Sequence, residues 1–486
     1  MIDPTGPWAT AAEIAGAVAA GAVSAVAVAE AVLARIAEAE PGLGAYTDVT
    51  EERALREAAA VDASVAAGRP VGPLSGVPFA VKNLFDVAGL PTRAGSRINR
   101  ERAPAAADAV LVRRMSEAGA VLLGALNMGE YAYDFTGENA HDGVCRNPHD
   151  FGRMSGGSSS GCGAATAAGL APVSLGSDTN GSLRVPASLC GVFSLKPTFG
   201  RLSRTGTFPF VDSLDHLGPM ARTARDLALA YDALQGPCPE DHGRARRPAE
   251  PVAPGLGRRR RLRVGVLGGW FRENAGEQAR AAVASVAAAL GPYADVGEVD
   301  LDQAEAGRAA AYLITNAESA DFHRERLRER AVDFDPETRD RFLAGSLLPA
   351  QWVARARRVR RWWLGHALAA FHDFDLLVAS ATPCAAPRTG EKTLTIAGKA
   401  FPLRPTLGLL AQPFSCIGLP VATVPVFGRD PLPVGVQLVA PPWREEDCVQ
   451  TAHRLEEEGA AIAYPPSVSW DQASSGRRFR TGRMAV

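Results

Sequence analysis

The sequence predicts an α/β fold in which helices cover both faces of one sheet. The first observation is an alternation along the chain. Segments rich in Ala, Glu and Arg, which favour helices, are followed by short runs of Val and Leu, which favour buried strands. The second is the composition, because 47% hydrophobic residues in a chain of 486 suffice to bury a large core.

The predicted elements begin with helices over residues 10–67. Their start at Thr10-Ala-Ala-Glu13 fits a capping box, in which the Thr10 and Glu13 side chains satisfy the first free backbone N–H groups. Residues 108–119 fit a helix that ends on a glycine, and residues 120–125 a buried strand. Four further apolar runs are expected to be strands: 262–269, 375–380, 421–427 and 434–440.

A composition break at residues 236–261 predicts a surface connector, because this segment is rich in Pro, Gly and Arg. Its arginine run, Arg258–Arg261, allows two interpretations, a nucleic-acid patch or a solvated linker, and the second fits a segment next to a strand better. The Arg-rich residues 474–486 are expected to be poorly ordered.

Charge and cysteine usage exclude several classes of function. A formal net charge of −1 gives no attraction to nucleic acid or to an anionic membrane. The apolar run at residues 14–29 is mostly alanine and too short for a membrane span. Seven scattered cysteines without a C-x-x-C pair indicate reduced thiols in a cytoplasm. No H-E-x-x-H and no dinucleotide fingerprint occurs, so we expect neither a metal nor an organic cofactor.

The stretch GGSSSGCG at residues 156–163 allows several interpretations. A flexible linker fits poorly, because residues 161–176 are small and apolar, as in a packed helix and strand. A P-loop would need a lysine that is missing. The stretch formally contains a nucleophile elbow centred on Ser159, but an elbow follows a strand directly, and the polar residues 146–154 predict none. A Ser-His-Asp hydrolase stays open, although no later histidine has a distinctive setting.

Two other segments carry candidate chemistry. Ser182 closes a turn that begins at Ser177, and consecutive N–H groups in such a turn can form an anion-binding nest. Beside a serine hydroxyl, that nest has the chemical form of an oxyanion hole. Lys82 ends the apolar run at residues 77–81, where desolvation would lower the pKa of its ammonium group and leave a neutral base. The alternative is a surface lysine at the end of a strand.

Together these segments resemble the amidase signature family. The motifs G-V-P-x-x-V-K, Gly-Gly-Ser-Ser and D-x-x-G-S-x-R-x-P-A occur in the family's order, and the step of 24 residues from Ser158 to Ser182 matches its spacing. The likeness extends to the C-terminal segments IGLPVATVPV and PVGVQLVAPP. It implies the amidase signature fold, which is a large mixed, mostly buried twisted sheet covered by helices on both faces.

The resemblance implies a hydrolase of linear amide C–N bonds with a Ser-Ser-Lys triad. Ser182 would be the nucleophile, Ser158 the bridging serine on a cis peptide bond, and Lys82 the base. The reaction would pass through an acyl-enzyme and release ammonia.

The turn around Ser182 would supply the oxyanion hole and its support. Asp178 and Arg184 would brace the turn by charge-assisted hydrogen bonds, and Ser159 would add local hydrogen bonds. Two residues depart from the family pattern: Asn83 replaces an aspartate after the lysine, and Asn180 replaces a glycine or glutamine. The implied oxyanion-hole residues are Thr179, Asn180, Gly181 and Ser182.

Residues 124–143, 177–219 and 434–445 resemble the branch typified by the biuret-type hydrolase subunit of s-triazine degradation, which acts on 1-carboxybiuret. A small ureido-type amide is therefore the implied substrate. An arginine that binds its carboxylate is expected, but the sequence does not say which one. Three residues are expected to line the pocket, each with a packing or loop role as its alternative: Tyr131, Asn139 and His141.

The branch also implies a homodimer and a small helical accessory subunit resembling the amidotransferase C subunit. Alternatives are the glutaminase (A) subunit of a tRNA-dependent amidotransferase, a broad-specificity amidase, and a non-catalytic subunit, against which the intact triad argues. The implied organisation is one domain over residues 1–470, with N-terminal helices at about 8–70, a catalytic core at about 71–235, the connector at 236–261, a second half at 262–470, and a tail at 471–486.

Overall fold

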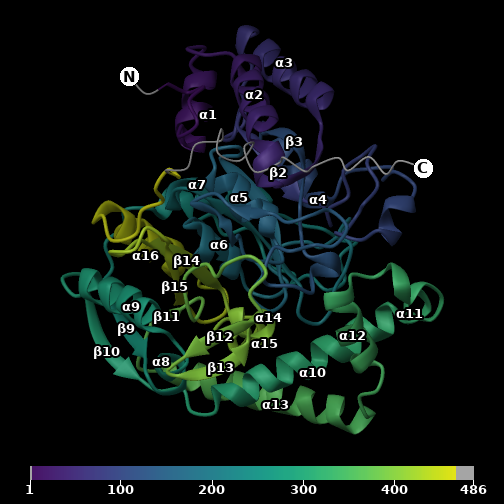
Figure 1. The fold of residues 1–486 in the computed structure, drawn as a ribbon. Coiled ribbons are helices and arrows are strands. Elements are labelled where there is room, and N and C mark those ends of the chain that lie inside the picture. The colour runs from purple at the N-terminus through teal and green to yellow at the C-terminus, as the bar shows by residue number, and fades with distance from the viewer. Residues whose placement is uncertain (1–2, 467–486) are drawn as a thin grey trace.

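The computed structural model describes residues 3–466 as an α/β fold built on one mixed sheet of 11 strands (Figure 1). This confirms the predicted fold class. From one edge to the other, the strands are β1 (Tyr46–Val49), β3 (Val121–Leu126), β2 (Pro78–Lys82), β6 (Val173–Asp178), β8 (His216–Ala221), β7 (Phe193–Lys196), β14 (Val421–Val426), β15 (Val434–Val439), β11 (Leu376–Ser380), β9 (Leu262–Leu267) and β10 (Ala294–Val299).

Helices pack on the sheet and around it. The first eight are α1 (Ala11–Ala19), α2 (Ala25–Leu43), α3 (Glu51–Ala66), α4 (Val110–Glu117), α5 (Ser160–Ala167), α6 (Arg184–Cys190), α7 (Ala224–Leu234) and α8 (Gly269–Glu273). The others are α9 (Glu277–Leu290), α10 (Ala304–Phe322), α11 (Arg324–Arg330), α12 (Pro336–Gly345), α13 (Ala350–Ala370), α14 (Leu403–Leu407), α15 (Gln412–Ile417) and α16 (Glu445–Glu457). Short 3-10 helices lie at Ile98–Glu101, Glu130–Ala132, Ala253–Gly255 and Ala331–Asp333.

The predicted elements are largely confirmed. The five predicted strands correspond to β3, β9, β11, β14 and β15, and the capping box of Thr10 and Glu13 starts α1. Two expectations are wrong. Strand β1 interrupts the predicted helical region as a partly exposed edge strand. Residues 146–154 form a hairpin of β4 (Arg146–Asn147) and β5 (Asp150–Met154). Only Asn147 and Met154 of its strand residues are buried, so its sequence lacks the regular apolar alternation of a core strand and resembles a loop.

The sheet topology brings the predicted site segments together. Strands β2 and β6 are parallel neighbours, so their carboxyl ends lie side by side. Lys82 is at the carboxyl end of β2, and Asp178 is at the carboxyl end of β6. Helix α5 begins at Ser160, within the GGSSSGCG stretch, and packs on β2 and β6. Helix α6 follows Ser182 and packs against α5. Three segments far apart in the sequence therefore meet at one place.

The helices α10 to α13 form a layer below the sheet in the view of Figure 1, separate from the N-terminal helices α1 to α3 at the top. Helix α10 packs against α12, α13 and α15. A second small hairpin, β12 (Thr393–Ile396) and β13 (Lys399–Pro402), lies beside α14. The predicted tail at residues 471–486 lies outside the described residues.

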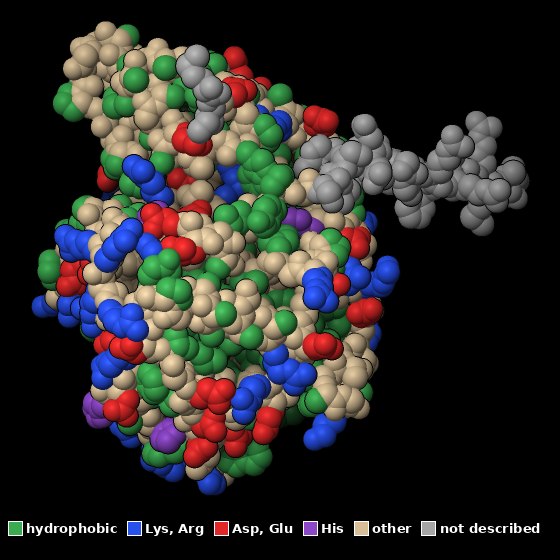
Figure 2. All heavy atoms as spheres, turned by 90° about the vertical axis from the view of Figure 1, so that its left-hand side faces the viewer, with side chains coloured by type: hydrophobic (Ala, Val, Ile, Leu, Met, Phe, Trp, Pro, Cys, Tyr) green, Lys and Arg blue, Asp and Glu red, His purple; other side chains and the backbone are tan. Residues whose placement is uncertain are grey.

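The surface carries both signs of charge. On the face shown in Figure 2, Lys and Arg side chains are interspersed with Asp and Glu, and hydrophobic side chains gather between them. Such mixing agrees with the net charge of −1. Within residues 3–466, no helix combines the length and the apolar character that crossing a membrane requires.

Candidate active site

Lys82 lies at the end of β2 with its side chain fully buried. Its Nζ atom is 2.7 Å from Ser158 Oγ and 2.9 Å from Ser177 Oγ. Burial lowers the pKa of Lys82 to about 7, so a large share of its amine is neutral near neutral pH. The alternative of a surface lysine is thereby excluded.

Ser158 follows two glycines that the local packing requires. The Gly157–Ser158 peptide bond is cis, as the family resemblance implies. Gly156 has a φ of +84°, and a Cβ there would lie 2.8 Å from Pro186 Cα. The Ser158 carbonyl accepts a hydrogen bond from Gly129 N at 3.2 Å, which holds the serine against the loop that starts at Gly129. A side chain at Gly156 would push this segment away from α6.

Ser182 lies directly beside the Ser158 segment, because Ser159 N donates to Ser182 O at 3.4 Å. Its side chain is almost fully buried, and its hydroxyl has no hydrogen-bond partner in the described part of the chain. Three backbone N–H groups of the turn, those of Thr179, Asn180 and Ser182, likewise find no acceptor within residues 3–466. The Gly181 N–H group is engaged, since it donates to Asp178 Oδ1 at 2.8 Å.

The turn is fixed by a buried ion pair. Arg184 Nε lies 3.0 Å from Asp178 Oδ2, and Arg184 Nη2 lies 3.0 Å from Asp178 Oδ1. Both side chains are fully buried. Although burial opposes ionisation, the Arg184 charge and hydrogen bonds hold the pKa of the Asp178 carboxyl well below its usual range. Arg184 Nη1 also donates to Gln437 Oε1 at 2.6 Å, which connects the turn to β15.

Ser159 and Ser177 form a hydrogen-bonded pair next to Lys82. Ser159 Oγ donates to Ser177 O at 3.1 Å and accepts from Ser177 N at 3.3 Å. Ser177 in turn contacts Lys82. Sequence reasoning did not single out Ser177, because its contact with Lys82 depends on the register between β2 and β6, in which Val81 pairs with Leu175.

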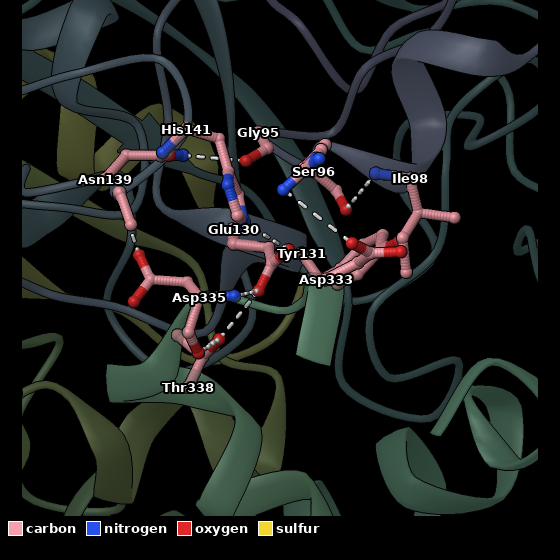
Figure 3. Close-up of polar contacts among 12 residues, drawn as sticks. Gly95, Ser96, Ile98, Glu130, Tyr131, Asn139, His141, Asp333, Asp335 and Thr338 are labelled. Atoms are coloured by element: carbon pink, nitrogen blue, oxygen red, sulfur yellow. Dashed lines mark hydrogen bonds and ion pairs between the residues drawn. The ribbon is translucent and has the colours of Figure 1, made fainter. Parts of the chain in front are cut away.

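Tyr131, Asn139 and His141 lie on the loop that starts at Gly129, and within residues 3–466 their side chains make no hydrogen bond to Lys82, Ser158 or Ser182. Figure 3 shows the contacts that they make instead. Asn139 Nδ2 donates to Gly95 O and Met128 O, both at 2.8 Å, and its Oδ1 accepts from His141 N at 2.7 Å. The amide of Asn139 is therefore fully used to hold this loop together.

The other two loop residues are also anchored. His141 Nε2 lies 3.2 Å from Glu130 Oε1, and the fully buried Glu130 accepts hydrogen bonds from Asp335 N and Thr338 Oγ1 at the start of α12 (Figure 3). Tyr131 is buried, and its ring centroid lies 4.1 Å from that of His323. Glu130, which the sequence did not indicate, thus fastens this loop to the helical layer.

Within residues 3–466, the side chain of Asn83, which replaces the expected aspartate, makes no hydrogen bond to Lys82 Nζ. Its Oδ1 accepts from Gly95 N at 3.0 Å and its Nδ2 donates to Thr47 Oγ1 at 3.3 Å. A neutral amide is therefore sufficient to connect β2 with the neighbouring loop.

Comparison with known proteins decides the family. The family described as Amidase matches residues 27–449, a range that includes Lys82, Ser158 and Ser182. The chain belongs to the amidase signature family. It is therefore a hydrolase of amide C–N bonds in small amide substrates.

Two relatives in sequence indicate the branch. The AtzE subunit of 1-carboxybiuret hydrolase from Pseudomonas sp. (strain ADP) is 52% identical over 452 residues, which cover 92% of this chain and 98% of that protein. The (A) subunit of glutamyl-tRNA(Gln) amidotransferase from Anaeromyxobacter sp. (strain K) is 36% identical, and the match covers 93% of this chain and 97% of that protein. The chain thus resembles the biuret-type branch more than this amidotransferase protein.

Solved structures agree with this. A structure of a vestigial protein complex that reveals the evolutionary origins of an s-triazine catabolic enzyme is 51% identical, with a TM-score of 0.92 over 94% of this chain and 100% of that chain. The 6-aminohexanoate cyclic dimer hydrolase complexed with substrate is 29% identical, with a TM-score of 0.83 over 96% and 99% of the two chains. The amidase signature fold is shared along nearly the whole length.

Proposed function

We propose that the chain hydrolyses the terminal amide of a small ureido-type carboxylate such as 1-carboxybiuret, and that it releases ammonia. The single observation that carries the catalytic part is the distance of 2.7 Å between the buried Lys82 Nζ and Ser158 Oγ. The backbone of Ser182 lies beside the same segment, because Ser159 N donates to Ser182 O. The substrate part is supported by the 52% identity to a protein of 1-carboxybiuret hydrolysis.

Acylation begins at the neutral amine of Lys82, which takes a proton from Ser158 while Ser158 takes one from Ser182. The Ser182 oxygen then attacks the amide carbonyl. The oxyanion that forms is held by the N–H groups of Thr179, Asn180 and Ser182, which have no other acceptor within residues 3–466. Loss of one such donor costs roughly 10²–10³ in rate in a model hydrolase. The Gly181 N–H group, which already donates to Asp178, adds less.

Collapse of the tetrahedral intermediate breaks the C–N bond. Ser158 returns its proton to the departing nitrogen, which leaves as ammonia, and takes another from Lys82. Water then attacks the acyl group on Ser182, with Lys82 and Ser158 again carrying the proton, and the free serine is restored.

For the substrate carboxylate we propose Arg341 of α12. Its guanidinium stacks on the Tyr133 ring at 3.7 Å from the centroid, and its Nη1 donates to Tyr133 O at 2.8 Å. The Tyr133 hydroxyl contacts Asn316 of α10, next to the Thr315 that holds Asn180. The loop with Tyr131 and His141 would form the wall of the same pocket, with Asn139 keeping that loop in shape.

We also propose a homodimer and a small helical accessory subunit. Support comes from the vestigial complex described for the 51% identical structure and from the likeness to an amidotransferase protein. A reducing, cytoplasmic location agrees with seven free cysteines. The division into one domain over residues 1–470 agrees with a sheet whose strands come from Tyr46 to Val439.

Labelling with a fluorophosphonate tests the serine-hydrolase mechanism. The parent protein should be labelled and Ser182→Ala should not. Ser160→Ala is the matched control, because its hydroxyl donates to Asn127 O, away from the lysine, and it should keep the label. Equal labelling of parent and Ser182→Ala would refute the mechanism.

Ammonia release from 1-carboxybiuret, biuret, allophanate, glutamine and aryl amides tests the substrate. The ureido compounds should be turned over fastest. Glutamine turnover that requires tRNA and partner subunits would instead establish the amidotransferase alternative, which the 36% identical relatives support.

A further inference from the structure

The Asn180 side chain is a half-satisfied polar group in the oxyanion turn. Its Nδ2 donates to Thr315 Oγ1 of α10 at 2.8 Å. Its Oδ1 is buried and has no hydrogen-bond partner in the described part of the chain, and the residue as a whole is only 6% exposed. Leaving a buried carbonyl unpaired is unfavourable, and buried polar groups are nearly always paired.

The position of this oxygen indicates what would pair with it. Asn180 lies between Thr179 and Gly181, two residues before the nucleophile, and its own N–H group is one of the free donors of the turn. A substrate carbonyl held by these donors would therefore bring its neighbouring atoms close to the Asn180 side chain. Because the amide group is planar, anchoring Nδ2 on Thr315 directs Oδ1 away from that anchor.

The free oxygen accepts a hydrogen bond and cannot donate one. A ureido-type substrate carries an N–H group directly beside its scissile carbonyl, whereas an ordinary carboxamide such as glutamine carries a CH2 group there. The N–H group would satisfy Oδ1, and the CH2 group would leave it buried and unpaired.

We infer that Asn180 is a specificity-determining residue, whose Oδ1 accepts a hydrogen bond from the N–H group beside the scissile carbonyl and so selects ureido-type over carboxamide substrates. Thr315 is the positioning residue that sets the amide orientation. This inference rests on the proposed function, because it assumes that the substrate carbonyl binds at the turn before Ser182.

The test uses two ligand pairs that differ only in this group: biuret against malonamide, and allophanate against malonamate. Binding to the full-length Ser182→Ala protein is measured by calorimetry, so that no turnover is needed. The N–H member of each pair should bind more tightly, by roughly 5- to 150-fold. Asn180→Ala in the same background should abolish the preference, and Thr315→Val should reduce it.

Thermal unfolding separates this role from a structural one. Asn180→Ala removes one hydrogen bond, to Thr315 Oγ1, together with an unpaired buried oxygen. Because these two losses act in opposite directions, its melting temperature should stay close to that of the parent. The matched control is Asn147→Ala, because Asn147 Nδ2 donates to Met154 O and Leu189 O and its Oδ1 accepts from His149 N. Losing these satisfied bonds should lower the melting temperature.

Three results would overturn the inference. One is a preference for the N–H ligands that survives Asn180→Ala. Another is an equal loss of affinity for both members of a pair, which would show that water occupies Oδ1. The third is absence of binding by any of the four ligands. If fluorophosphonate still labels Ser182 in the parent protein and in Asn180→Ala made with Ser182 intact, the proposed mechanism stands and only the role of Asn180 fails.

Discussion

Two buried lysines, Lys82 and Lys196, have nearly the same environment and different partners. Each ends a strand, β2 and β7, and each side chain is fully buried. Burial lowers the pKa of both to about 7, helped at Lys196 by the charge of Arg184. Lys82, however, contacts two serine hydroxyls, whereas Lys196 contacts the backbone carbonyls of Leu419 and Pro197.

The difference shows that desolvation alone does not make a catalytic base. A serine hydroxyl can give up a proton to a neutral amine, but a backbone carbonyl has no proton to give and can only accept a hydrogen bond. Lys196 instead adds positive charge beside the Asp178–Arg184 pair, and its charge helps to keep the pKa of the Asp178 carboxyl low. Lys82 therefore belongs to the proton path, and Lys196 to the support of the turn.

Replacing each lysine by methionine tests whether only Lys82 acts as the base, and the largest effect is expected here. Lys82→Met should lower the rate of acylation by roughly 10²–10⁴-fold, the usual contribution of a general base. Lys196→Met should lower that rate far less, because Lys196 takes no proton in the reaction and Arg184 still holds Asp178 in the turn. Burst kinetics with a chromogenic amide measure both.

A loss of acylation in Lys196→Met as large as that in Lys82→Met would contradict the assignment. The melting temperatures of the two variants must be compared first, so that unfolding is not mistaken for lost chemistry. Lys82→Arg is a further control, since an arginine stays protonated and cannot act as a base.

The sequence alone could not have separated these two lysines. Both follow apolar runs, and only the motif resemblance pointed to Lys82. Five strands of the central sheet, β3, β9, β11, β14 and β15, were predictable because their apolar runs are long enough to be distinctive. The contact between Lys82 and Ser177 was not predictable, because it depends on strand register, and neither was the use of the Asn139 amide, which depends on carbonyls that only the folded chain brings together.

The pH dependence of kcat/KM also distinguishes Lys82 from Lys196. Since only neutral Lys82 can accept a proton, kcat/KM should rise with pH up to about 7 and level off above it, falling about tenfold for each pH unit below. Lys196→Met should keep this rise at the same pH. If the rise of kcat/KM with pH disappeared in Lys196→Met, the base would be Lys196 and the assignment of Lys82 would be wrong.

Stability should respond to pH through both lysines. Each has a folded-state pKa near 7, below the ordinary value of 10.5, so the unfolded chain binds more protons between these two pH values. The free energy of unfolding therefore gains a contribution that increases as pH rises from about 7 to about 10.5. Urea titrations should show a flatter increase in Lys196→Met. An unchanged slope would mean that Lys196 keeps an ordinary pKa in the folded protein.

The smallest effect is expected at Ser177. A neutral lysine amine has two N–H groups and one lone pair, and an N–H donated to Ser177 Oγ turns the lone pair toward Ser158. Ser177→Ala removes one hydrogen bond worth about 0.5–1.5 kcal/mol, so kcat should fall roughly 2- to 13-fold while KM stays unchanged. Ser160→Ala, the matched serine at the start of α5, should leave kcat unchanged. A loss in Ser177→Ala as large as that in Lys82→Met would place Ser177 in the proton path itself, and the lysine would then act through two serines rather than one.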